Sequence, residues 1–378
     1  MKKICLITTS PLIVNFFLVP YLRELRALGD VYLALGVDED VALKQTHGAT
    51  TYRIPIKRHI APWHDVVALV QLTRFLVRNR PDVVHSFGPK AGLLVALAGW
   101  LARIPVRIHT FTGQVWMTRK GLMRRMLRAA DKLLAALDTH LLADSASQRD
   151  LLVADGLVAP EKCKVLASGS VSGVDTSRFR PDAAARAEIR SALEIPADAL
   201  VYLFLGRVTR DKGVLDLARA FATAGADIGY LVFVGPDEQG LQPEIERLCD
   251  AQRARLRFVP YTAAPERYLA SADVLCLPSY REGFGTSIIE GAATGIPALA
   301  SGIYGISDAV VDGVTGLLHP PGAVDAIAGG MRRLAQDSNL RGQLGGAAHQ
   351  RAVVEFSEAH VMSAVLEFYR ETLRGGAA

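Results

Sequence analysis

Residues 279–295, SYREGFGTSIIEGAATG, connect two apolar runs at 273–278 and 296–300. A loop with two glycines leads into a helical segment, so the local pattern is strand, loop, helix, strand. Continuous rather than alternating apolar runs are typical of parallel strands that are covered on both faces. In open parallel sheets, ligands bind at the carboxyl ends of the strands. This stretch therefore predicts both an α/β fold and the place of a ligand site.

Two carboxylates mark the same stretch, Glu282 in the loop and Glu290 in the helical segment. A helix amino terminus offers unpaired N–H groups and a partial positive charge, which suit a phosphate group. Thr286 or Ser287 is expected to cap this helix. Amides for phosphate and carboxylates for hydroxyl groups together predict a nucleotide-sugar site.

A second polar loop follows another apolar run, with the sequence GRVTRDKG at 206–213. Gly206 allows a sharp backbone turn. Arg207 and Lys212 supply a planar fork and a point charge that can neutralise a diphosphate. The alternative is a solvated basic turn, but the carboxylates downstream favour the phosphate interpretation.

Strand-like and helix-like segments alternate along the whole chain, which predicts parallel α/β units. The predicted strands are 4–8, 30–35, 83–86, 106–110, 139–143, 164–167, 201–205, 230–234, 256–259, 274–277 and 297–300. The predicted helices are 16–28, 63–79, 91–102, 120–137, 147–154, 214–223, 241–252, 265–271, 287–294, 324–335, 339–354 and 358–373. The Gly-, Ser- and Pro-rich segment 168–181 interrupts this alternation. It predicts domains 1–180 and 181–357, with 358–374 returning to the first.

Composition narrows the class of protein further. No apolar run in the 378 residues approaches the roughly 20 needed to span a bilayer, and the start resembles a first strand rather than a signal peptide. The four cysteines are far apart, which disfavours a metal site or a disulfide framework and fits a reducing cytoplasm. Residues 1–180 carry a net charge of +11 and the remainder −6. The basic half predicts an anionic partner such as a membrane surface, or else a solvated basic face.

The sequences GRVTRDKG and EGFGTSIIE resemble two elements of the retaining GT-B glycosyltransferases of family four. Similar family-like pieces lie at 173–179 and 312–317, so the resemblance spans most of the chain. It implies two Rossmann-like, doubly wound domains facing a cleft, with a last helix that crosses back to the first domain.

The resemblance also implies roles for individual residues. Arg207 and Lys212 would bind the diphosphate, Glu282 the transferred sugar and Glu290 the ribose. The implied catalytic residues are Arg207, Lys212, Glu282 and His109, and the implied donor-binding residues are Gly206, Gly283, Phe284, Gly285, Thr286 and Glu290. Preorganised cations stabilise the charge that develops on a departing nucleoside diphosphate. The family implies retention without an agreed protein nucleophile, with the leaving phosphate taking the acceptor proton.

In the first domain the informative stretch is IHTFTGQVW at 108–116, which runs from a strand end into a glycine-containing loop. The family often has a histidine here that reaches the donor sugar, although a lone histidine at a strand end is often structural. The acceptor-side candidates are Asn15, Lys90, Thr112, Gly113 and Gln114. The sequence departs from the family at 10–17, where an apolar loop replaces a common Gly-Gly loop. That loop would face a lipid acceptor or simply pack.

The segment 114–128, QVWMTRKGLMRRMLR, alternates basic and apolar residues. It resembles a subgroup that extends polyprenyl-diphosphate-linked sugars at the cytoplasmic membrane face, and such segments bind anionic interfaces. An ordinary helix with a basic face is the alternative. The triplet Asp38-Glu39-Asp40 matches a DxD metal motif but lies in the wrong half, so no metal is expected. No GxGxxG follows the first strand, which disfavours a dinucleotide dehydrogenase.

These observations predict a retaining, metal-independent glycosyltransferase without a cofactor. Its donor is expected to be a nucleotide sugar, with UDP favoured by the subgroup resemblance. Its acceptor is expected to be a lipid-linked saccharide in bacterial glycan, capsule or lipopolysaccharide assembly, at the inner face of the cell membrane, with no nucleic-acid partner. The alternatives are a sugar-nucleotide epimerase or phosphorylase of the same fold, and a non-catalytic regulator that binds sugar nucleotides.

Overall fold

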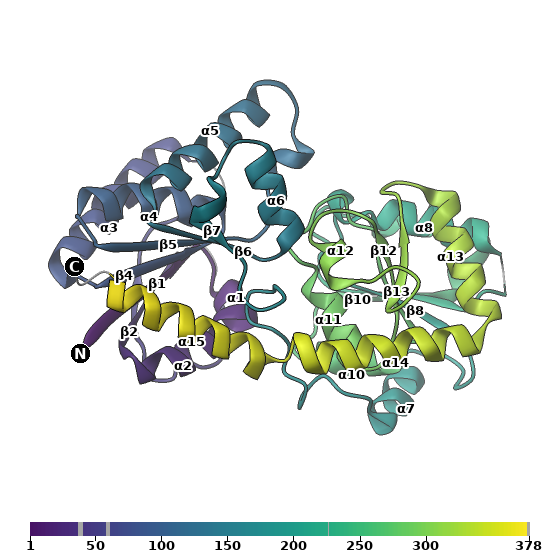
Figure 1. The fold of residues 1–378 in the computed structure, drawn as a ribbon. Helices are drawn as coiled ribbons and strands as arrows, with labels where there is room; N and C mark the ends of the chain where they lie inside the picture. The colour runs from purple at the N-terminus through teal and green to yellow at the C-terminus, as the bar shows by residue number, and fades with distance from the viewer. Residues whose placement is uncertain (37–40, 58–60, 226, 376–378) are drawn as a thin grey trace. The chain divides into compact units, whose positions relative to one another are not determined.

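The computed structural model describes residues 1–36, 41–57, 61–225 and 227–375, which form two compact units (Figure 1). Unit 1 comprises Met1–Ser172 with Glu358–Ala378, and unit 2 comprises Gly173–Ser357. The sequence predicted a domain boundary after residue 180, whereas the two units divide between Ser172 and Gly173. The triplet Asp38-Glu39-Asp40 lies outside the described residues.

Unit 1 is built on a seven-stranded, wholly parallel sheet with the order β3-β2-β1-β4-β5-β6-β7. Its strands are β1 Lys2–Thr8, β2 Gly29–Leu35, β3 Thr50–Arg53, β4 Val83–Phe87, β5 Val106–Phe111, β6 His140–Ala143 and β7 Cys163–Lys164. The strand order reverses between β1 and β4, so this point is the topological switch at which an open sheet places its ligand crevice.

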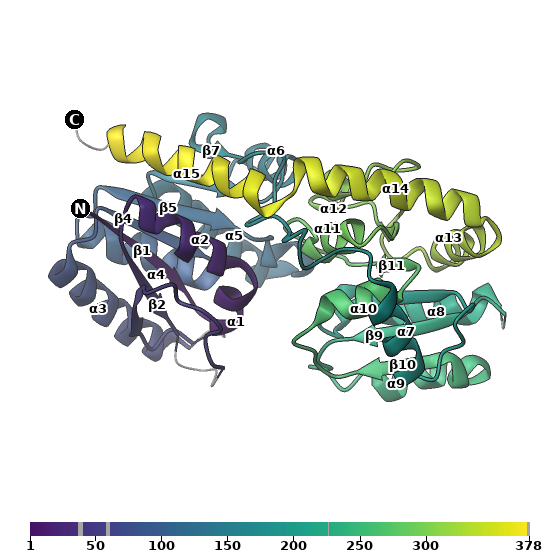
Figure 2. The ribbon, with the colours of Figure 1, turned by 90° about the horizontal axis from the view of Figure 1, so that it is seen from below.

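Helices cover both faces of this sheet, because successive strand residues point to opposite sides. Ile4 and Leu6 of β1 pack with the helices of one face, α2 and α15, whereas Cys5 and Ile7 pack with α3 and α4 on the other. The helices are α1 Pro11–Ile13, α2 Val19–Glu24, α3 Pro62–Asn79, α4 Pro89–Leu101, α5 Gly121–Leu137, α6 Ala146–Ala154 and α15 Glu358–Gly375. Figure 2 shows α15 lying along unit 1 beside α2.

The last helix, α15, belongs to the core of unit 1. Val365, Phe368 and Tyr369 are buried with strand residues from the other end of the chain. The Tyr369 hydroxyl lies 2.7 Å from Nδ1 of His85 in β4, and Nε2 of His85 lies 2.7 Å from Oγ1 of Thr110. Burial lowers the pKa of His85 well below its usual value, so the ring is neutral. The predicted return of the C-terminal helix to the first domain agrees with this packing.

Unit 2 is built on a six-stranded parallel sheet with the order β10-β9-β8-β11-β12-β13 and a switch between β8 and β11. Its strands are β8 Val201–Leu205, β9 Tyr230–Val234, β10 Leu256–Val259, β11 Val274–Leu277, β12 Ala298–Ser301 and β13 Gly316–His319. Its helices are α7 Ala183–Ala192, α8 Val214–Ala224, α9 Gln242–Leu248, α10 Pro265–Ser271, α11 Thr286–Ala293, α12 Ile306–Ala309, α13 Val324–Gln336 and α14 Ser338–Glu355. None of the described helices in either unit has both the length and the apolar stretch that crossing a membrane requires.

The predicted α/β architecture with two doubly wound domains is confirmed, but several elements differ from the prediction. The strand expected at 164–167 lies instead at Cys163–Lys164, and the helix expected at 16–28 starts as a π-helix, Val14–Leu18, and ends as a 3-10 turn. Strands β3 and β13 and helix α7 were not predicted. Both strands lie at sheet edges and have only four residues each. The strand β3, TTYR, is polar and largely exposed, whereas β13, GLLH, is mostly buried but too short to show a strand pattern.

Candidate active site

The two polar loops predicted from the sequence meet at the switch point of unit 2. The loop 206–213 follows β8, and the stretch 279–295 follows β11, which is the neighbouring strand. Both loops therefore leave the same carboxyl edge of the sheet, where open α/β sheets bind ligands. Because both loops follow strand ends at the switch point, residues about 70 positions apart in the chain, such as Lys212 and Glu282, come together.

Gly213 makes this meeting sterically feasible. Its φ is +70°, a left-handed backbone conformation that residues other than glycine disfavour. A Cβ at this position would lie 2.0 Å from the carbonyl oxygen of Pro278, so the backbone of one loop passes directly against the other. The backbone N–H of Tyr280 donates to the carbonyl of Asp211 at 2.9 Å and joins the loops again.

The predicted residues Lys212 and Glu282 form an ion pair, with Nζ of Lys212 2.5 Å from Oε1 of Glu282. Their side chains are only 17% and 13% exposed, so this pair is shielded from solvent more than a surface salt bridge is. The hydroxyl of Ser279 donates to the same Glu282 oxygen at 2.7 Å. Ser279 is fully buried and was missed by the sequence analysis, although it is the first polar residue after β11.

Arg207 lies on the same edge and is paired with Glu238, with Nη1 2.8 Å from Oε2. Gly206 precedes it, and its N–H donates to the carbonyl of Val234 at 2.9 Å. Glu238 follows β9, the strand next to β8, and was not predicted. The rule that polar residues after neighbouring strands converge would have identified it.

Two further contacts fix the shape of this loop pair. Arg281 pairs with Asp211 at 3.3 Å, and the Tyr280 hydroxyl donates to Asp216 at 2.6 Å. The hydrogen bond to Asp216 raises the pKa of Tyr280 to about 12, so the phenol keeps its proton. The cations Arg207 and Lys212 are thus held beside a rigid, hydrogen-bonded framework, which is the preorganisation that electrostatic stabilisation of charge requires.

Helix α11 begins differently from the prediction. Its N-cap is Gly285, with φ +85°, and no side chain caps the helix, so Thr286 and Ser287 are not capping residues. Thr286 is instead the first helical residue. The positive end of α11 therefore has no side-chain cap, and such an end favours an anion. Phe284 is buried, and its ring centroid lies 5.2 Å from that of Phe356, so the side chain belongs to the core of unit 2.

Glu290 lies within α11, near an ion pair that the sequence did not reveal. Burial raises the pKa of Glu290 to about 8, while the nearby Arg178 guanidinium acts in the opposite direction. Arg178 pairs with Glu266 at 2.6 Å, and this second carboxylate also favours the protonated form of Glu290. Arg178 belongs to a family-like segment, but its partner on α10 is set by the tertiary structure alone.

In unit 1 the acceptor-side candidates follow the adjacent strands β1, β4 and β5. Asn15 uses its amide within the protein, since Nδ2 donates to the carbonyl of Ala42 at 2.9 Å and Oδ1 accepts from the N–H of Lys44 at 2.8 Å. Nζ of Lys90 lies 2.6 Å from Oδ1 of Asp65 at the start of α3.

His109 lies in the interior of unit 1 rather than in the loop that follows β5. It is 1% exposed, and Nδ1 lies 2.8 Å from Oγ of Ser86. Its ring fills the space above Gly92 of α4, where a Cβ would approach Cε1 to 2.4 Å. Burial lowers the pKa of His109 to about 3, so the ring is neutral. This position favours a structural role over contact with a substrate.

The loop 112–114 follows β5 as predicted, but its members differ in accessibility. Gln114 is buried and accepts a hydrogen bond from Nε2 of Gln148 at 3.1 Å. Gly113 is buried with φ +103°, and Thr112 is partly exposed. Across the part of the chain that the structure describes, no group of three or more His, Cys, Asp or Glu side chains is arranged to hold a metal ion.

Solved structures with the same architecture identify the class of protein. HepE from Anabaena, in complex with UDP and glucose, matches 98% of this chain and 100% of its own with a TM-score of 0.83 at 19% identity. A sucrose-phosphate synthase from Thermosynechococcus elongatus matches 99% and 100% with a TM-score of 0.82 at 22% identity. At these identities the likeness concerns the fold. Two doubly wound parallel sheets in tandem define a protein of the GT-B fold.

Sequence comparisons then identify the family. A model described as "Glycosyl transferase 4-like domain" matches residues 18–169, and one described as "Glycosyl transferases group 1" matches residues 185–351. The capsular polysaccharide biosynthesis glycosyltransferase CapM from Staphylococcus aureus is 28% identical over 88% of both chains. A D-inositol 3-phosphate glycosyltransferase from Streptomyces bingchenggensis is 34% identical over 78% of this chain and 67% of its own. The chain therefore belongs to the GT-B glycosyltransferases of the family four type and is an enzyme of that family.

Proposed function

We propose that this glycosyltransferase is retaining and metal-independent, and that it moves a sugar from a UDP-sugar to a lipid-linked saccharide. The acceptor is a polyprenyl-diphosphate-linked glycan, in the assembly of a bacterial polysaccharide at the inner face of the cell membrane. The observation that carries the donor part is the shielded Lys212–Glu282 pair beside Arg207, at the switch point of unit 2.

The donor fits the order of groups along this edge. Lys212 and Arg207 provide positive charge for the diphosphate, Glu282 accepts hydrogen bonds from hydroxyls of the sugar, and Glu290 accepts those of the ribose. Lys212 and Glu282 lie in contact, so a bound donor can take the ammonium with its phosphate and the carboxylate with its hydroxyl groups. The complexes of HepE with UDP and UDP-glucose support a uridine nucleotide.

The proposed reaction takes its retention of configuration from the family resemblance. The bond between the anomeric carbon and the diphosphate oxygen breaks, and a bond to the acceptor oxygen forms on the same face of the sugar. The acceptor hydroxyl gives its proton to the departing phosphate. Arg207 and Lys212 stabilise the negative charge that builds up on the nucleoside diphosphate, and they are already in position before the reaction begins.

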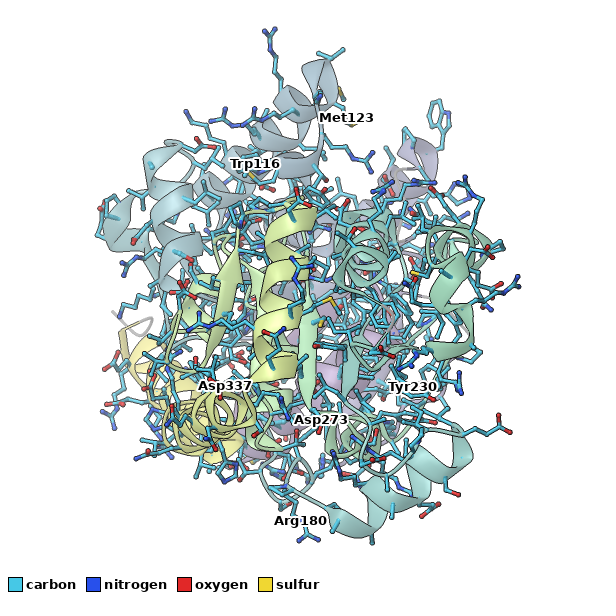
Figure 3. The ribbon with its side chains drawn as sticks, turned by 90° about the vertical axis from the view of Figure 1, so that its right-hand side faces the viewer. Trp116, Met123, Arg180, Tyr230, Asp273 and Asp337 are labelled. Carbon is cyan, nitrogen blue, oxygen red and sulfur yellow. The ribbon has the colours of Figure 1, made fainter. Side chains whose placement is uncertain are left out.

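A lipid-linked acceptor and a membrane-bound site of action are supported by helix α5 and the residues before it. The exposed apolar residues Leu122, Met126 and Leu133 are spaced along one side of α5, and Arg125 and Lys132 lie next to them. Figure 3 shows Met123 near the tip of this helix and Trp116 closer to the body of unit 1. Apolar side chains flanked by cations are the pattern of a helix that lies in an anionic interface.

The direct test is a donor screen. The enzyme is incubated with each of several UDP-, GDP- and ADP-sugars and a polyprenyl-diphosphate-linked saccharide, and the lipid product is analysed by mass spectrometry. The expected result is the addition of one sugar residue from a UDP-sugar without added metal and in the presence of a chelator. NMR of the product should show the anomeric configuration of the donor.

Nucleotide binding gives a second, simpler measurement. UDP at 100 times its Kd should stabilise the protein by about 2.7 kcal/mol, which a thermal shift detects. Stabilisation by NAD but by none of UDP, GDP and ADP would refute the proposed donor. An epimerase would convert the UDP-sugar without an acceptor, and a regulator would bind it without turnover.

A further inference from the structure

Helix α3 of unit 1 has two apolar faces, of which only one is used in the core. Its inner face buries Ala68, Leu72 and Leu76 against the sheet. Its outer face carries Trp63, which is 84% exposed, together with four valines that are between 43% and 55% exposed, at positions 66, 67, 70 and 77.

The outer residues form a stripe rather than a scatter. At about 100° per residue, positions 63, 67, 70 and 77 fall on one side of the helix, and positions 68, 72 and 76 fall on the opposite side. A helix that only covers a sheet needs one apolar stripe. The second stripe of α3 is therefore unexplained by the packing of unit 1.

A groove runs along this stripe. It has a volume of about 370 Å³ and is lined almost entirely by apolar surface from the outer side of α3 and from Leu101 at the end of α4. Arg74 and Arg78 also line it. Such an apolar groove can hold the acyl chain of a lipid, while the two guanidinium groups pair with its anionic headgroup.

The neighbouring helices extend the same surface. Helices α3, α4 and α5 lie side by side on one face of the sheet, because α4 contacts both of the others (Figure 1). Helix α4 adds exposed Trp100 and Leu101, and α5 adds its own exposed apolar stripe. Across these three helices every exposed charged side chain is basic, since their two aspartates, Asp65 and Asp131, are only partly exposed.

We propose that the outer face of α3 docks on an anionic lipid bilayer, with Trp63 at the level of the headgroups and the groove beside Val70 and Val77 occupied by an acyl chain. The proposal rests on the membrane part of the proposed function and adds a second helix to α5. Tryptophan is enriched at membrane–water interfaces, and juxtamembrane cations attract anionic lipids.

The charge of this face favours a bilayer over a second copy of the chain. In a two-fold dimer the same patch lies on both partners, so Arg74 and Arg78 of one copy would face cations of the other. Like charges brought together in this way oppose association, whereas an anionic membrane neutralises them.

The test is flotation of the purified full-length protein with vesicles of phosphatidylcholine containing phosphatidylglycerol, compared with phosphatidylcholine alone. The variant Val67→Glu/Val70→Glu introduces two carboxylates at exposed positions of the stripe. The matched control, Ala359→Glu/Ser363→Glu, adds the same two charges at exposed positions of α15 on the opposite face of the sheet. Thermal shift with UDP confirms that each variant is folded and retains its donor site.

Wild-type protein is expected to float with the anionic vesicles and to lose binding at high salt. Val67→Glu/Val70→Glu should lower the partition coefficient about tenfold or more, while the α15 control should stay within about twofold of wild type. Flotation of the stripe variant equal to wild type would overturn the proposal.

Two further measurements keep the outcomes separate. If Leu122→Glu/Met126→Glu abolishes flotation and Val67→Glu/Val70→Glu does not, the α3 proposal fails while the membrane part of the proposed function stands. If light scattering shows a wild-type dimer that the α3 variant dissociates, with flotation unchanged, the stripe is a contact between copies and the proposal is wrong.

Discussion

The two sheets of this protein have equivalent switch points, but the segments that follow β8 and β11 of unit 2 differ in chemistry from the segment that follows β1 of unit 1. Between β8 and β11 of unit 2 the loops are rich in glycine and charge, and they bring Lys212 to Glu282. Between β1 and β4 of unit 1 the segment 10–17 has no glycine and carries an exposed Phe16 ring, with Nζ of Lys44 6.0 Å from its centroid.

The difference shows that topology supplies the position of a site while loop composition supplies its chemistry. Glycines at 206, 213 and 285 let the backbone of these loops approach a ligand closely, as a diphosphate requires. An apolar helical segment with one cation beside an aromatic ring suits a ligand with apolar and anionic parts. We therefore expect substitutions in unit 2 to affect turnover and donor binding, and substitutions in unit 1 to affect folding or the acceptor.

The largest effect is expected from the cations of unit 2. Arg207→Ala or Lys212→Ala should each reduce kcat by about 10²–10³, because each removes a preorganised charge that stabilises the departing diphosphate. The measurement is steady-state transfer at saturating donor. Arg210→Ala in the same loop, whose guanidinium pairs with Glu244 and is 60% exposed, is the matched control and should change kcat little.

If either of the first two variants keeps wild-type turnover, the assignment of that cation is wrong.

Gly213→Ala tests whether the close passage of the two loops is required. The new Cβ would collide with the Pro278 carbonyl, so we expect a loss of about 3 kcal/mol in the free energy of unfolding, together with weaker UDP binding. Urea unfolding and a UDP titration measure the two effects. Gly240→Ala also has a positive φ but nothing within 4 Å of its Cβ, and it should cost only about 1 kcal/mol. Equal losses in the two variants would show that the contact with Pro278 is unimportant.

His109→Ala distinguishes a structural from a catalytic histidine in unit 1. The buried ring and its contact with Ser86 should contribute about 2–3 kcal/mol to the free energy of unfolding, while kcat changes by less than about threefold. Denaturant unfolding and kinetics below the unfolding transition provide the comparison. A fall in kcat of about 100-fold without a loss of stability would instead establish the catalytic role that the sequence predicted.

The smallest expected effect concerns Glu290 and depends on pH. Its pKa near 8 in the free protein means that the carboxyl must ionise before it accepts two ribose hydroxyls, so UDP binding releases a proton. The affinity for UDP should therefore rise about tenfold between about pH 7 and pH 9 as the carboxylate forms. Glu290→Gln should bind more weakly at high pH and show a flat profile. A wild-type profile that is flat, or that falls over this range, would contradict a role for Glu290 in ribose binding.

The same pKa has a consequence for folding with a defined sign. Because burial raises the pKa of Glu290 in the folded state above its value in the unfolded chain, this group favours the folded protein most at low pH. That contribution is lost as the pH rises through about 8. If Glu290 binds the ribose as proposed, UDP should offset this loss.

Much of the fold could be predicted from the sequence, because buried parallel strands have continuous apolar sequences. The four strands β8, β9, β10 and β11 were predicted with the bounds that the structure shows. The edge strand β3, with the sequence TTYR, could not be predicted, since it is largely exposed and has no apolar pattern. This segment forms a strand because it pairs with β2, and its own sequence does not indicate that pairing.

The site was predictable to the extent that it follows strand ends. Lys212 and Glu282 come together because both follow strands at the switch point. Partners fixed by tertiary packing were not predictable: Glu238 beside Arg207, Ser279 beneath Glu282, and Glu266 beside Arg178. His109 illustrates the converse, because the sequence places it next to a loop while the side-chain direction in β5 points it into the core.

The docking of α15 has a consequence for the order of events during synthesis. The strands of unit 1 precede unit 2 in the chain, yet their core is completed by Val365, Phe368 and Tyr369, which follow unit 2. Unit 2, from Gly173 to Ser357, is continuous and can bury its own core as soon as it has emerged. Unit 2, although it follows the strands of unit 1 in the chain, can therefore finish folding first. The buried face of β4 around His85 remains uncovered until residues 365–369 have been synthesised, so this face is exposed to aggregation while unit 2 is being made.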